Sequence, residues 1–454
     1  MAHNIKFASK LGMIAATVGS AVGLGNVWRF PAEVQSNGGA VFLLIYVCCI
    51  FLFGIPVMTA EFALGRGGES DAVGVFSHVT PRRKSWRLAG LLAIISSYLI
   101  LSFYMVVSGW TFEYLIQSIT GGLYSSGLGD SEEVFRDRMG SFITDSFRPI
   151  IVTVIMILGN IFVLIRGVQK GIEKMSNIMM PILFLLLLIF CGVSLSLDKA
   201  REGLEFFLRP DFSALTPTTV INALGQAFFS LSLAMGILIT YASYFPSDAR
   251  LTRTAVTVSL LDLGVALLMV IIIFPAVMTF GLQGSNLAGS ALVFVTLPEI
   301  FAQMGGTRIW SSLFFLILTV AAFTSTISLS EVSVSFMQNR IGLSRAKAVL
   351  SVMLPLLILS SICSLSVGQW SGFTIAGFTI FDFLDTITTN FMLPLGGILL
   401  CVYMGWIAPK EFFHNELTNN GTLHTRVTGA IYFIVKWIAP VLIAVILLWQ
   451  LFGR

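Results

Sequence analysis

Long apolar stretches separated by short polar segments run along the whole chain. A helix needs about 20 mainly apolar residues to cross the hydrocarbon core of a bilayer. On this rule the sequence predicts about eleven membrane-spanning helices, at about residues 11–35, 41–65, 88–119, 149–166, 175–197, 218–243, 255–281, 308–337, 346–363, 382–406 and 428–452. The moderately apolar segment 285–303 is expected to be re-entrant or interfacial. We therefore expect an all-α membrane protein built as one helical bundle.

Composition and charge support this class. The chain is 56% hydrophobic and 11% charged, whereas soluble domains carry roughly 25% charged residues. The net charge of +4 is too small to indicate a nucleic-acid partner. Lys and Arg gather in alternate connections between the spans, at Lys6, Lys10, Arg82, Arg83, Lys84, Arg87, Arg166, Lys170, Lys174, Arg250, Arg253, Arg340, Arg345 and Lys347. Because cytoplasmic loops carry such an excess, we expect a multi-pass protein of the cell (inner or plasma) membrane with its N-terminus in the cytoplasm.

The first span contains a stretch, Thr17–Pro31, that is poorly suited to a continuous helix. Its unfavourable residues are Gly19, Gly23, Gly25, Asn26 and Arg29. Each Gly costs a helix about 1 kcal/mol relative to Ala. An Arg at membrane depth costs a few kcal/mol or more unless it finds a partner or a water-filled cavity. The stretch predicts a broken helix whose unwound middle offers backbone groups to a ligand and to ions.

The span at 218–243 has the same character. Gln226, Ser230, Ser232 and Gly236 lie in its middle. Interrupted segments at corresponding positions of two halves indicate an inverted-repeat transporter with a midplane binding site. We therefore expect a first repeat at about 11–197, a second at about 218–406 and an additional helix at about 428–452. A helix-packing role for Gly19 and Gly23 is the simpler interpretation of the first segment, but it does not account for the second.

Further polar side chains are predicted at membrane depth. They are Glu61, Tyr104, Asp262, Asp385 and the cluster Thr324, Ser325 and Thr326. Single Ser and Thr hydroxyls usually bond back to their own helix, but intramembrane Asp and Glu are functional by default. We expect Glu61 to accept hydrogen bonds from amides freed by the broken helices. Oxygen ligands without His or Cys suit hard cations, which favours a Na⁺ site over a transition-metal site.

A broken helix also offers two opposite poles to a ligand. The exposed helix N-terminus carries free N–H groups and partial positive charge, which suit a carboxylate. The facing C-terminal end offers carbonyl groups to an ammonium. Together these poles fit the backbone of an amino acid. No constellation such as paired Asp, HExxH or Ser–His indicates an enzyme.

Six motifs resemble the neurotransmitter:sodium symporter family, in particular its bacterial amino-acid branch with the leucine-transporter fold. They are SAVGLGNVWRFP (20–31), QSNGGAVF (35–42), GIPVMTAEFALGR (54–66), GQAFFSLSLAMG (225–236), ITYASY (239–244) and FTSTISL (323–329). The resemblance extends over nearly the whole chain and implies a single transporter domain at 1–454, with broken helices one and six.

The resemblance implies two sodium sites. The first would use the carbonyl group of Ala21, the side chains of Asn26, Ser230 and Asp262, and the substrate carboxylate. The second would use the carbonyl groups of Gly19, Val22 and Ala321 with the hydroxyls of Thr324 and Ser325.

The resemblance also implies the substrate site and its gate. The substrate carboxylate would meet the amides of Gly23, Leu24 and Gly25 and the hydroxyl of Tyr104. The ammonium would meet the carbonyl groups of Ala21, Phe229 and Ser230, and the side-chain pocket would be shaped by Phe229, Ser232, Met235, Ser325 and Leu329. Arg29 and Asp385 would form the outer gate, with Phe229 as a lid, and Phe7 takes the position of an inner-gate Trp.

Several positions depart from the family pattern. Asp262 stands where Asn is common, Ser230 where Thr is common, and Ala266 where chloride-dependent relatives have Ser. The fixed Asp262 carboxylate could replace the charge of chloride, so we expect chloride independence. Ala234 replaces a usual Gly and is expected to restrict the unwound segment.

The sequence thus predicts a sodium-coupled symporter that imports a hydrophobic or aromatic amino acid by alternating access. Its expected partners are this small molecule, sodium ions and the lipid bilayer. Two alternatives remain open at this point: a sensor on the same fold that binds without transporting, and a sodium channel. Measured flux separates the sensor, and saturable stoichiometric uptake separates the channel.

Overall fold

The computed structural model describes residues 6–124, 131–282, 289–423 and 427–452, and within these ranges the chain is helical apart from its connections and one isolated bridge between Ile375 and Phe378. The predicted all-α class is confirmed. Nine helices in the described part are long and apolar enough to cross a membrane: Ala40–Gly68 (α3, η2 and α4), Lys84–Thr120 (η3 and α6), Arg148–Ile165 (α8), Val168–Leu195 (η5 and α9), Leu251–Phe280 (α13), Thr307–Ile341 (α16), Arg345–Val367 (α17), Ile380–Ile407 (α18, η8, α19 and η9) and Thr428–Phe452 (α21, η10 and α22).

The two spans that were expected to be broken are interrupted. Helix α1 (Lys10–Ala21) is followed by a bend of 54° before Gly25–Ser36, which comprises η1 and α2. Helix α11 (Pro217–Ser230) and helix α12 (Ile237–Ser243) are separated by residues 231–236. The number of membrane crossings and the inverted repeat stay predictions.

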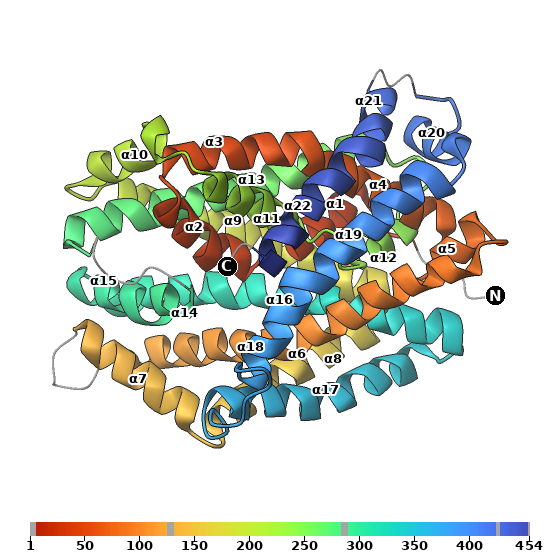
Figure 1. Cartoon of the computed structure of the whole chain (residues 1–454). Helices are drawn as coiled ribbons and strands as arrows, with labels where there is room; N and C mark the ends of the chain where they lie inside the picture. The colour runs from red at the N-terminus through yellow and green to blue at the C-terminus, as the bar shows by residue number, and fades with distance from the viewer. Residues whose placement is uncertain (1–5, 125–130, 283–288, 424–426, 453–454) are drawn as a thin grey trace.

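The long helices α6 (Arg87–Thr120) and α16 run side by side through the middle of the bundle (Figure 1). Short helices lie in the connections: α5 (Gly74–Val79), α7 (Glu132–Thr144), α10 (Ala200–Leu208), α15 (Leu297–Gln303) and α20 (Lys410–Thr418). In the segment expected to be re-entrant, residues 289–303 are helical, while 283–288 lie outside the described residues.

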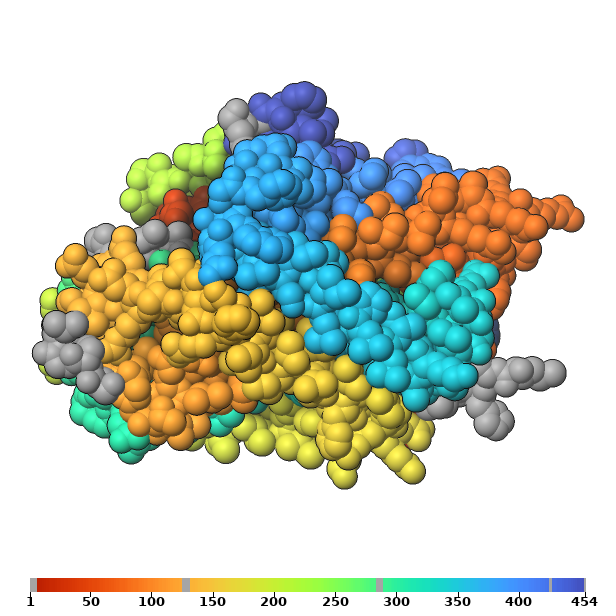
Figure 2. Space-filling model, turned by 90° about the horizontal axis from the view of Figure 1, so that it is seen from below, coloured from red at the N-terminus to blue at the C-terminus, as the bar shows by residue number. Residues whose placement is uncertain are grey.

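The outer surface of the bundle is strongly apolar. Helix α17, in light blue, lies against α7 and α8 on the face seen in Figure 2. On α8 and α17 large apolar side chains are exposed, including Ile151, Ile155, Leu158, Phe162, Leu354 and Ile358. Such continuous apolar surface is unusual on soluble monomers and suits contact with lipid.

The N-terminal segment is fastened to one end of the bundle. Phe7 packs against the rings of Tyr241, Tyr244 and Phe245. Glu173 at the end of η5 accepts hydrogen bonds from the Ala8 amide at 2.8 Å and from the Ser9 amide and hydroxyl at 3.0 and 2.7 Å. These contacts close this end of the bundle around the start of α1.

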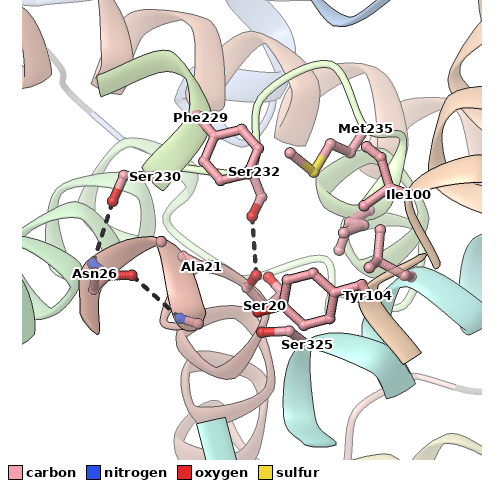
Figure 3. A pocket seen from close by; sticks show the side chains of 14 residues that line it. Ser20, Ala21, Asn26, Ile100, Tyr104, Phe229, Ser230, Ser232, Met235 and Ser325 are labelled. Carbon is pink, nitrogen blue, oxygen red and sulfur yellow. Dashed lines mark hydrogen bonds between the residues drawn. The ribbon is translucent and has the colours of Figure 1, made fainter. Parts of the chain in front are cut away.

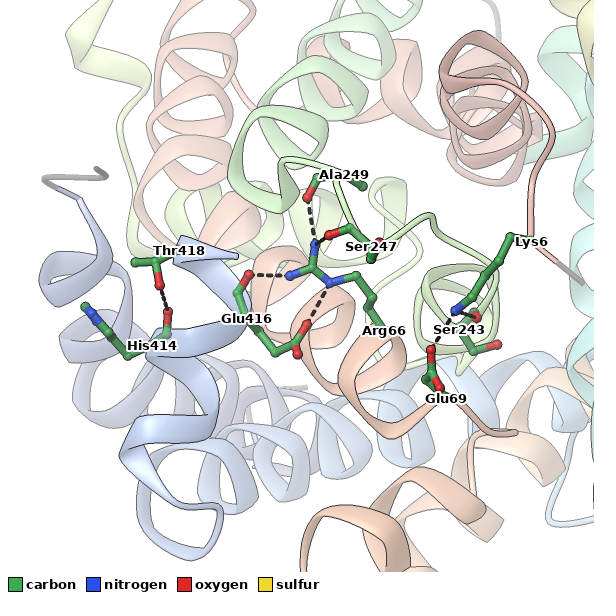
Figure 4. Close-up of polar contacts among 9 residues, drawn as sticks. All are labelled: Lys6, Arg66, Glu69, Ser243, Ser247, Ala249, His414, Glu416 and Thr418. Atoms are coloured by element: carbon green, nitrogen blue, oxygen red, sulfur yellow. Dashed lines mark hydrogen bonds and ion pairs between the residues drawn. The ribbon is translucent and has the colours of Figure 1, made fainter. Parts of the chain in front are cut away.

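Salt bridges reinforce the same closure. Lys6 pairs with Glu69 at 2.9 Å and also donates to the Ser243 carbonyl group at 3.1 Å (Figure 4). Lys10 pairs with Asp248 at 2.8 Å. The hydrogen bond and charge of Lys10 lower the pKa of the Asp248 carboxyl below its ordinary value.

Arg66 joins three separate segments near this end. Its guanidinium donates to the Glu416 side chain at 2.7 Å, to the Glu416 carbonyl group, and to the Ala249 carbonyl group at 2.7 Å (Figure 4). Arg66 is only 7% exposed. It therefore connects α4 (Ile55–Gly68) to α20 and to the connection before α13.

We expect Arg66→Lys to lower the free energy of unfolding by about 2 kcal/mol, because an ammonium group cannot reproduce the planar fork and leaves buried acceptors unpaired. Thermal unfolding of the detergent-purified protein measures this loss. The matched control is Arg83→Lys, at an exposed site, which should stay within about 0.5 kcal/mol of wild type. Equal melting temperatures for the two variants would contradict the role of Arg66.

Candidate functional site

The first break comprises residues 22–24, between α1 and η1. Two of its three amide groups are bound by side chains of the protein. The Leu24 amide donates to the Tyr104 hydroxyl at 2.9 Å, and the Gly23 amide donates to Oδ1 of Asn26 at 3.2 Å. The amides expected to meet a substrate carboxylate therefore lie beside the predicted Tyr104 hydroxyl.

The carbonyl groups at the end of α1 have partners of the same kind. The Ser325 hydroxyl donates to the Val22 carbonyl group at 3.2 Å, and it lies 3.5 Å from that of Gly19. The Ser232 hydroxyl, in the second break, donates to the Ser20 carbonyl group at 2.9 Å (Figure 3). The two broken helices and α16 thus share their polar groups in the middle of the bundle.

The second break, residues 231–236, has a strained backbone. Ser232, Ala234 and Gly236 have φ of 53°, 62° and 72°, in the left-handed region that favours glycine. The Ala234 amide donates to the fully buried Glu61 carboxylate at 2.6 Å. The expectation that Glu61 accepts from an amide freed by a broken helix is confirmed. The Ser97 hydroxyl also bonds the Met235 carbonyl group, a contact that the sequence analysis missed.

A buried carboxylate lies where the two breaks approach α13. Asn26 donates to Oδ1 of Asp262 at 2.8 Å, and the Ser230 hydroxyl donates to Oδ2 at 2.7 Å. All three residues are at most 2% exposed. The side chains expected at the first sodium site are therefore brought together, although they come from three helices. The fully buried Tyr46 lies near Ser230 and Asp262 with its hydroxyl unpartnered among the described residues, and the sequence pattern did not indicate this position.

The groups expected at the second sodium site lie between α1 and α16. The Thr324 hydroxyl donates to the carbonyl groups of Val320 at 3.2 Å and Ala321 at 3.1 Å within its own helix. Gly19 faces Thr324 closely: a Cβ added at Gly19 would lie 3.4 Å from that of Thr324. The Ser325 hydroxyl therefore lies next to the carbonyl groups of Gly19 and Val22, whereas the Thr324 side chain faces Gly19 with its hydroxyl bonded within α16.

A small enclosed pocket lies between the breaks (Figure 3). It has a volume of about 40 Å³ and is lined by Ser20, Ala21, Gly23, Gly25, Asn26, Ile100, Tyr104, Phe229, Ser230, Ser232, Met235, Ile237, Ser325 and Leu329. Every residue predicted to bind the substrate lines it except Leu24, whose amide bonds to Tyr104. Ser20, Ile100 and Ile237 are additions that spacing alone could not indicate, because they only face the pocket once the helices are packed.

The residues expected to form the gate lie next to a second, larger cavity. This gate cavity has a volume of about 650 Å³, and both Arg29 and Asp385 line it. The Arg29 guanidinium lies 4.8 Å from the centre of the Phe229 ring and 3.9 Å from the Glu33 carboxylate. Asp385 accepts a hydrogen bond from Thr389 at 3.0 Å. In the described part of the chain Arg29 forms no ion pair with Asp385; Arg29 lines the gate cavity, and the Phe229 ring that it covers lines the pocket.

Two interrupted helices that meet at a buried polar site define a secondary transporter. Comparison with known families agrees, because the model of the sodium:neurotransmitter symporter family matches residues 5–127 and 138–453. The chain belongs to this family of sodium symporters, which is a family of membrane transporters and not of enzymes.

Individual relatives resemble the chain over almost its full length. An uncharacterised sodium-dependent transporter of Bacillus subtilis (strain 168), YhdH, is 33% identical over 444 residues, which cover 98% of this chain and 97% of that protein. An uncharacterised sodium-dependent transporter of Methanocaldococcus jannaschii is 35% identical and covers 88% of this chain and 81% of its own. The crystal structure of MhsT in complex with L-phenylalanine matches with a TM-score of 0.88 and 40% identity, over 98% of this chain and 99% of that one.

The strained break gives a direct prediction. A left-handed backbone conformation destabilises a residue that has a Cβ atom by roughly 1–2 kcal/mol relative to glycine. Ala234→Gly should therefore stabilise the protein by about 1 kcal/mol in thermal unfolding. The control Ala223→Gly, in the buried middle of α11, should destabilise it by at least about 1 kcal/mol. A loss of stability in Ala234→Gly would show that packing of the Ala234 methyl group stabilises the protein by more than the backbone strain destabilises it.

Proposed function

We propose that the protein is a sodium-coupled symporter that imports a hydrophobic or aromatic amino acid by alternating access and without chloride. The observation that carries this proposal is the joint position of a buried carboxylate, Asp262, and an enclosed pocket between two helix breaks. One side of the pocket offers backbone groups suited to an amino-acid backbone, and the other is apolar.

The composition of the pocket supports an apolar substrate side chain. Ile100, Phe229, Met235, Ile237 and Leu329 line it, and no Asp, Glu, Lys or Arg does. The L-phenylalanine bound in the MhsT structure is consistent with this class of substrate. The present volume of about 40 Å³ is far below the few hundred Å³ typical of ligand pockets. Substrate entry would therefore displace side chains, and Met235 is suited to this because its unbranched side chain re-packs readily.

The first sodium ion would bind as a co-substrate at Asp262, Asn26 and Ser230, with the Ala21 carbonyl group. A carboxylate, an amide oxygen and a hydroxyl make a hard-cation ligand set. The second would bind at the carbonyl groups of Gly19, Val22 and Ala321 and the hydroxyls of Thr324 and Ser325. A substrate carboxylate at the Gly23–Gly25 amides would lie next to the first ion, which would make the two binding events interdependent.

Chloride independence follows from the charge of the same site. Asp262 is fully buried with Asn26 and Ser230 as its hydrogen-bond donors, and as a carboxylate it would supply the negative charge for a bound sodium ion. A sodium ion there would be neutralised without an external anion. Ala266, fully buried one helical turn later, offers no hydroxyl to bind one.

In the transport cycle, the gate would close when Arg29 moves from Glu33 toward Asp385 over the Phe229 ring. The segment from Phe7 to Ser9 would dissociate from its contacts with the bundle, which would open the end of the bundle opposite the gate cavity. With the N-terminus in the cytoplasm of a cell-membrane protein, the gate cavity faces outward. Each sodium ion crossing 100 mV contributes roughly 2.3 kcal/mol, which is sufficient for substantial accumulation of a zwitterion.

The primary experiment is uptake of radiolabelled phenylalanine, leucine and tryptophan into proteoliposomes under an inward Na⁺ or K⁺ gradient, each with and without Cl⁻. We expect saturable uptake that requires Na⁺ and does not change when gluconate replaces Cl⁻. Binding of an amino acid without any Na⁺-driven uptake would favour a sensor. Sodium flux in the absence of any amino acid would favour a channel.

The sodium assignment is tested by Asp262→Asn. Loss of the charge should raise the Na⁺ concentration for half-maximal substrate binding by about tenfold or more, since a lost charged hydrogen bond costs about 1.5–3 kcal/mol. Scintillation-proximity binding of labelled substrate against Na⁺ concentration measures this shift. The control Asp211→Asn, at an exposed site outside the membrane helices, should leave the curve unchanged. An unshifted curve for Asp262→Asn would refute the assignment.

A further inference from the structure

A third cavity, of about 560 Å³, lies at the start of α13 and shares no lining residue with the central pocket or the gate cavity. The start of α13 contributes Arg250, Thr252, Arg253 and Val256 to its lining. A later part of the chain contributes Leu417 and Leu423. Its lining therefore combines two arginines with apolar side chains.

The cavity lies at a boundary between membrane and water. Helix α13 begins at Leu251 and is long and apolar enough to cross a bilayer, so its first turn marks one end of a span. Leu417 and Leu423 lie in the connection between the spans Ile380–Ile407 and Thr428–Phe452. The cavity thus lies between the first turn of one span and the connection that joins two others, at the depth of lipid headgroups.

The polar groups around the cavity have unused binding capacity for an anion. The Arg250 and Arg253 side chains are exposed, and within the described ranges neither forms an ion pair or a hydrogen bond. Among the described residues no side chain caps the N-terminus of α13, so its first N–H groups have no side-chain partner there. The Thr252 hydroxyl is buried and has no partner among the described residues.

The described carboxylates near the cavity are already engaged in ion pairs. The two carboxylates closest in sequence to the lining residues are Asp248 and Glu416. Asp248 is paired with Lys10, and Glu416 is paired with Arg66. Two guanidinium groups and a helix N-terminus therefore converge on a cavity with no described carboxylate in its lining.

We propose that this cavity binds an anionic phospholipid. Its phosphate lies between Arg250 and Arg253 at the N-terminus of α13, where free N–H groups and the helix dipole favour negative charge. The glycerol and first acyl carbons lie along Val256, Leu417 and Leu423. A free inorganic anion would use only the arginines, whereas a phospholipid uses the arginines, the apolar side chains and the adjacent bilayer.

The bound lipid would also support the closed end of the bundle. Leu417 belongs to α20, and the neighbouring Glu416 holds Arg66 of α4. Filling the cavity therefore stabilises the position of α20 against α13 and, through Arg66, the end of α4.

The test is native mass spectrometry of the delipidated full chain in detergent, titrated with phosphatidylglycerol, with phosphatidylcholine or with inorganic phosphate. We expect the first phosphatidylglycerol to bind at least about tenfold more tightly than phosphatidylcholine, since each Arg near a membrane surface contributes about 1 kcal/mol. Arg250→Gln/Arg253→Gln should abolish this preference. The matched control Arg82→Gln/Arg83→Gln, two exposed arginines outside the cavity, should retain it.

Three results would overturn the proposal. They are a preference that survives in Arg250→Gln/Arg253→Gln, equal loss in both double variants, and competition by millimolar inorganic phosphate that removes all lipid selectivity. The single variant Arg253→Gln changes an exposed side chain that has no partner among the described residues, so it should fold even if the double variant does not. It should weaken phosphatidylglycerol binding severalfold. None of these outcomes depends on which substrate the transporter carries.

Discussion

Inside a bilayer, every backbone group released by a helix break must find a partner within the protein, because no lipid group can replace it. Among the side chains that meet this demand, Tyr104 and Glu61 accept from freed amides, while Ser325 and Ser232 donate to carbonyl groups. Three of these four also line the central pocket. The side chains that stabilise the broken helices are thus largely the same side chains that a bound ligand would contact.

The breaks could be predicted from the sequence because their cause is local. A segment with several glycines, Asn26 and Arg29 is poorly suited to an ordinary membrane helix. A carboxylate at membrane depth, such as that of Glu61, requires a hydrogen-bond partner. The meeting of Asn26, Ser230 and Asp262 was available only through the family resemblance, since it joins residues 236 positions apart in the chain. The contact of Ser97 with the Met235 carbonyl group and the place of Tyr46 were missed, because a single hydroxyl on an apolar helix gives no distinctive pattern.

The gate illustrates a different limit. A sequence pattern identifies charges that can pair but does not say which pair is formed in one conformation. Here Arg29 lies over Phe229 and near Glu33, four residues away on the same helical segment. Asp385 lines the same cavity without pairing with it. The contacts of Phe7 with aromatic rings and the hydrogen bonds of the Arg66 guanidinium likewise depend on packing between distant segments.

The two lysines that fasten the N-terminal segment differ from Asp262 in their surroundings. In the Lys10–Asp248 pair both side chains are about two-thirds exposed, at 67% and 66%, and Glu69, the partner of Lys6, is 54% exposed. Exposed pairs are screened by salt within a Debye length of about 8 Å at physiological ionic strength, whereas buried groups are screened much less. The balance between the two ends of the bundle should therefore depend on ionic strength: concentrated electrolyte loosens the end held by lysines and leaves the central carboxylate almost unaffected.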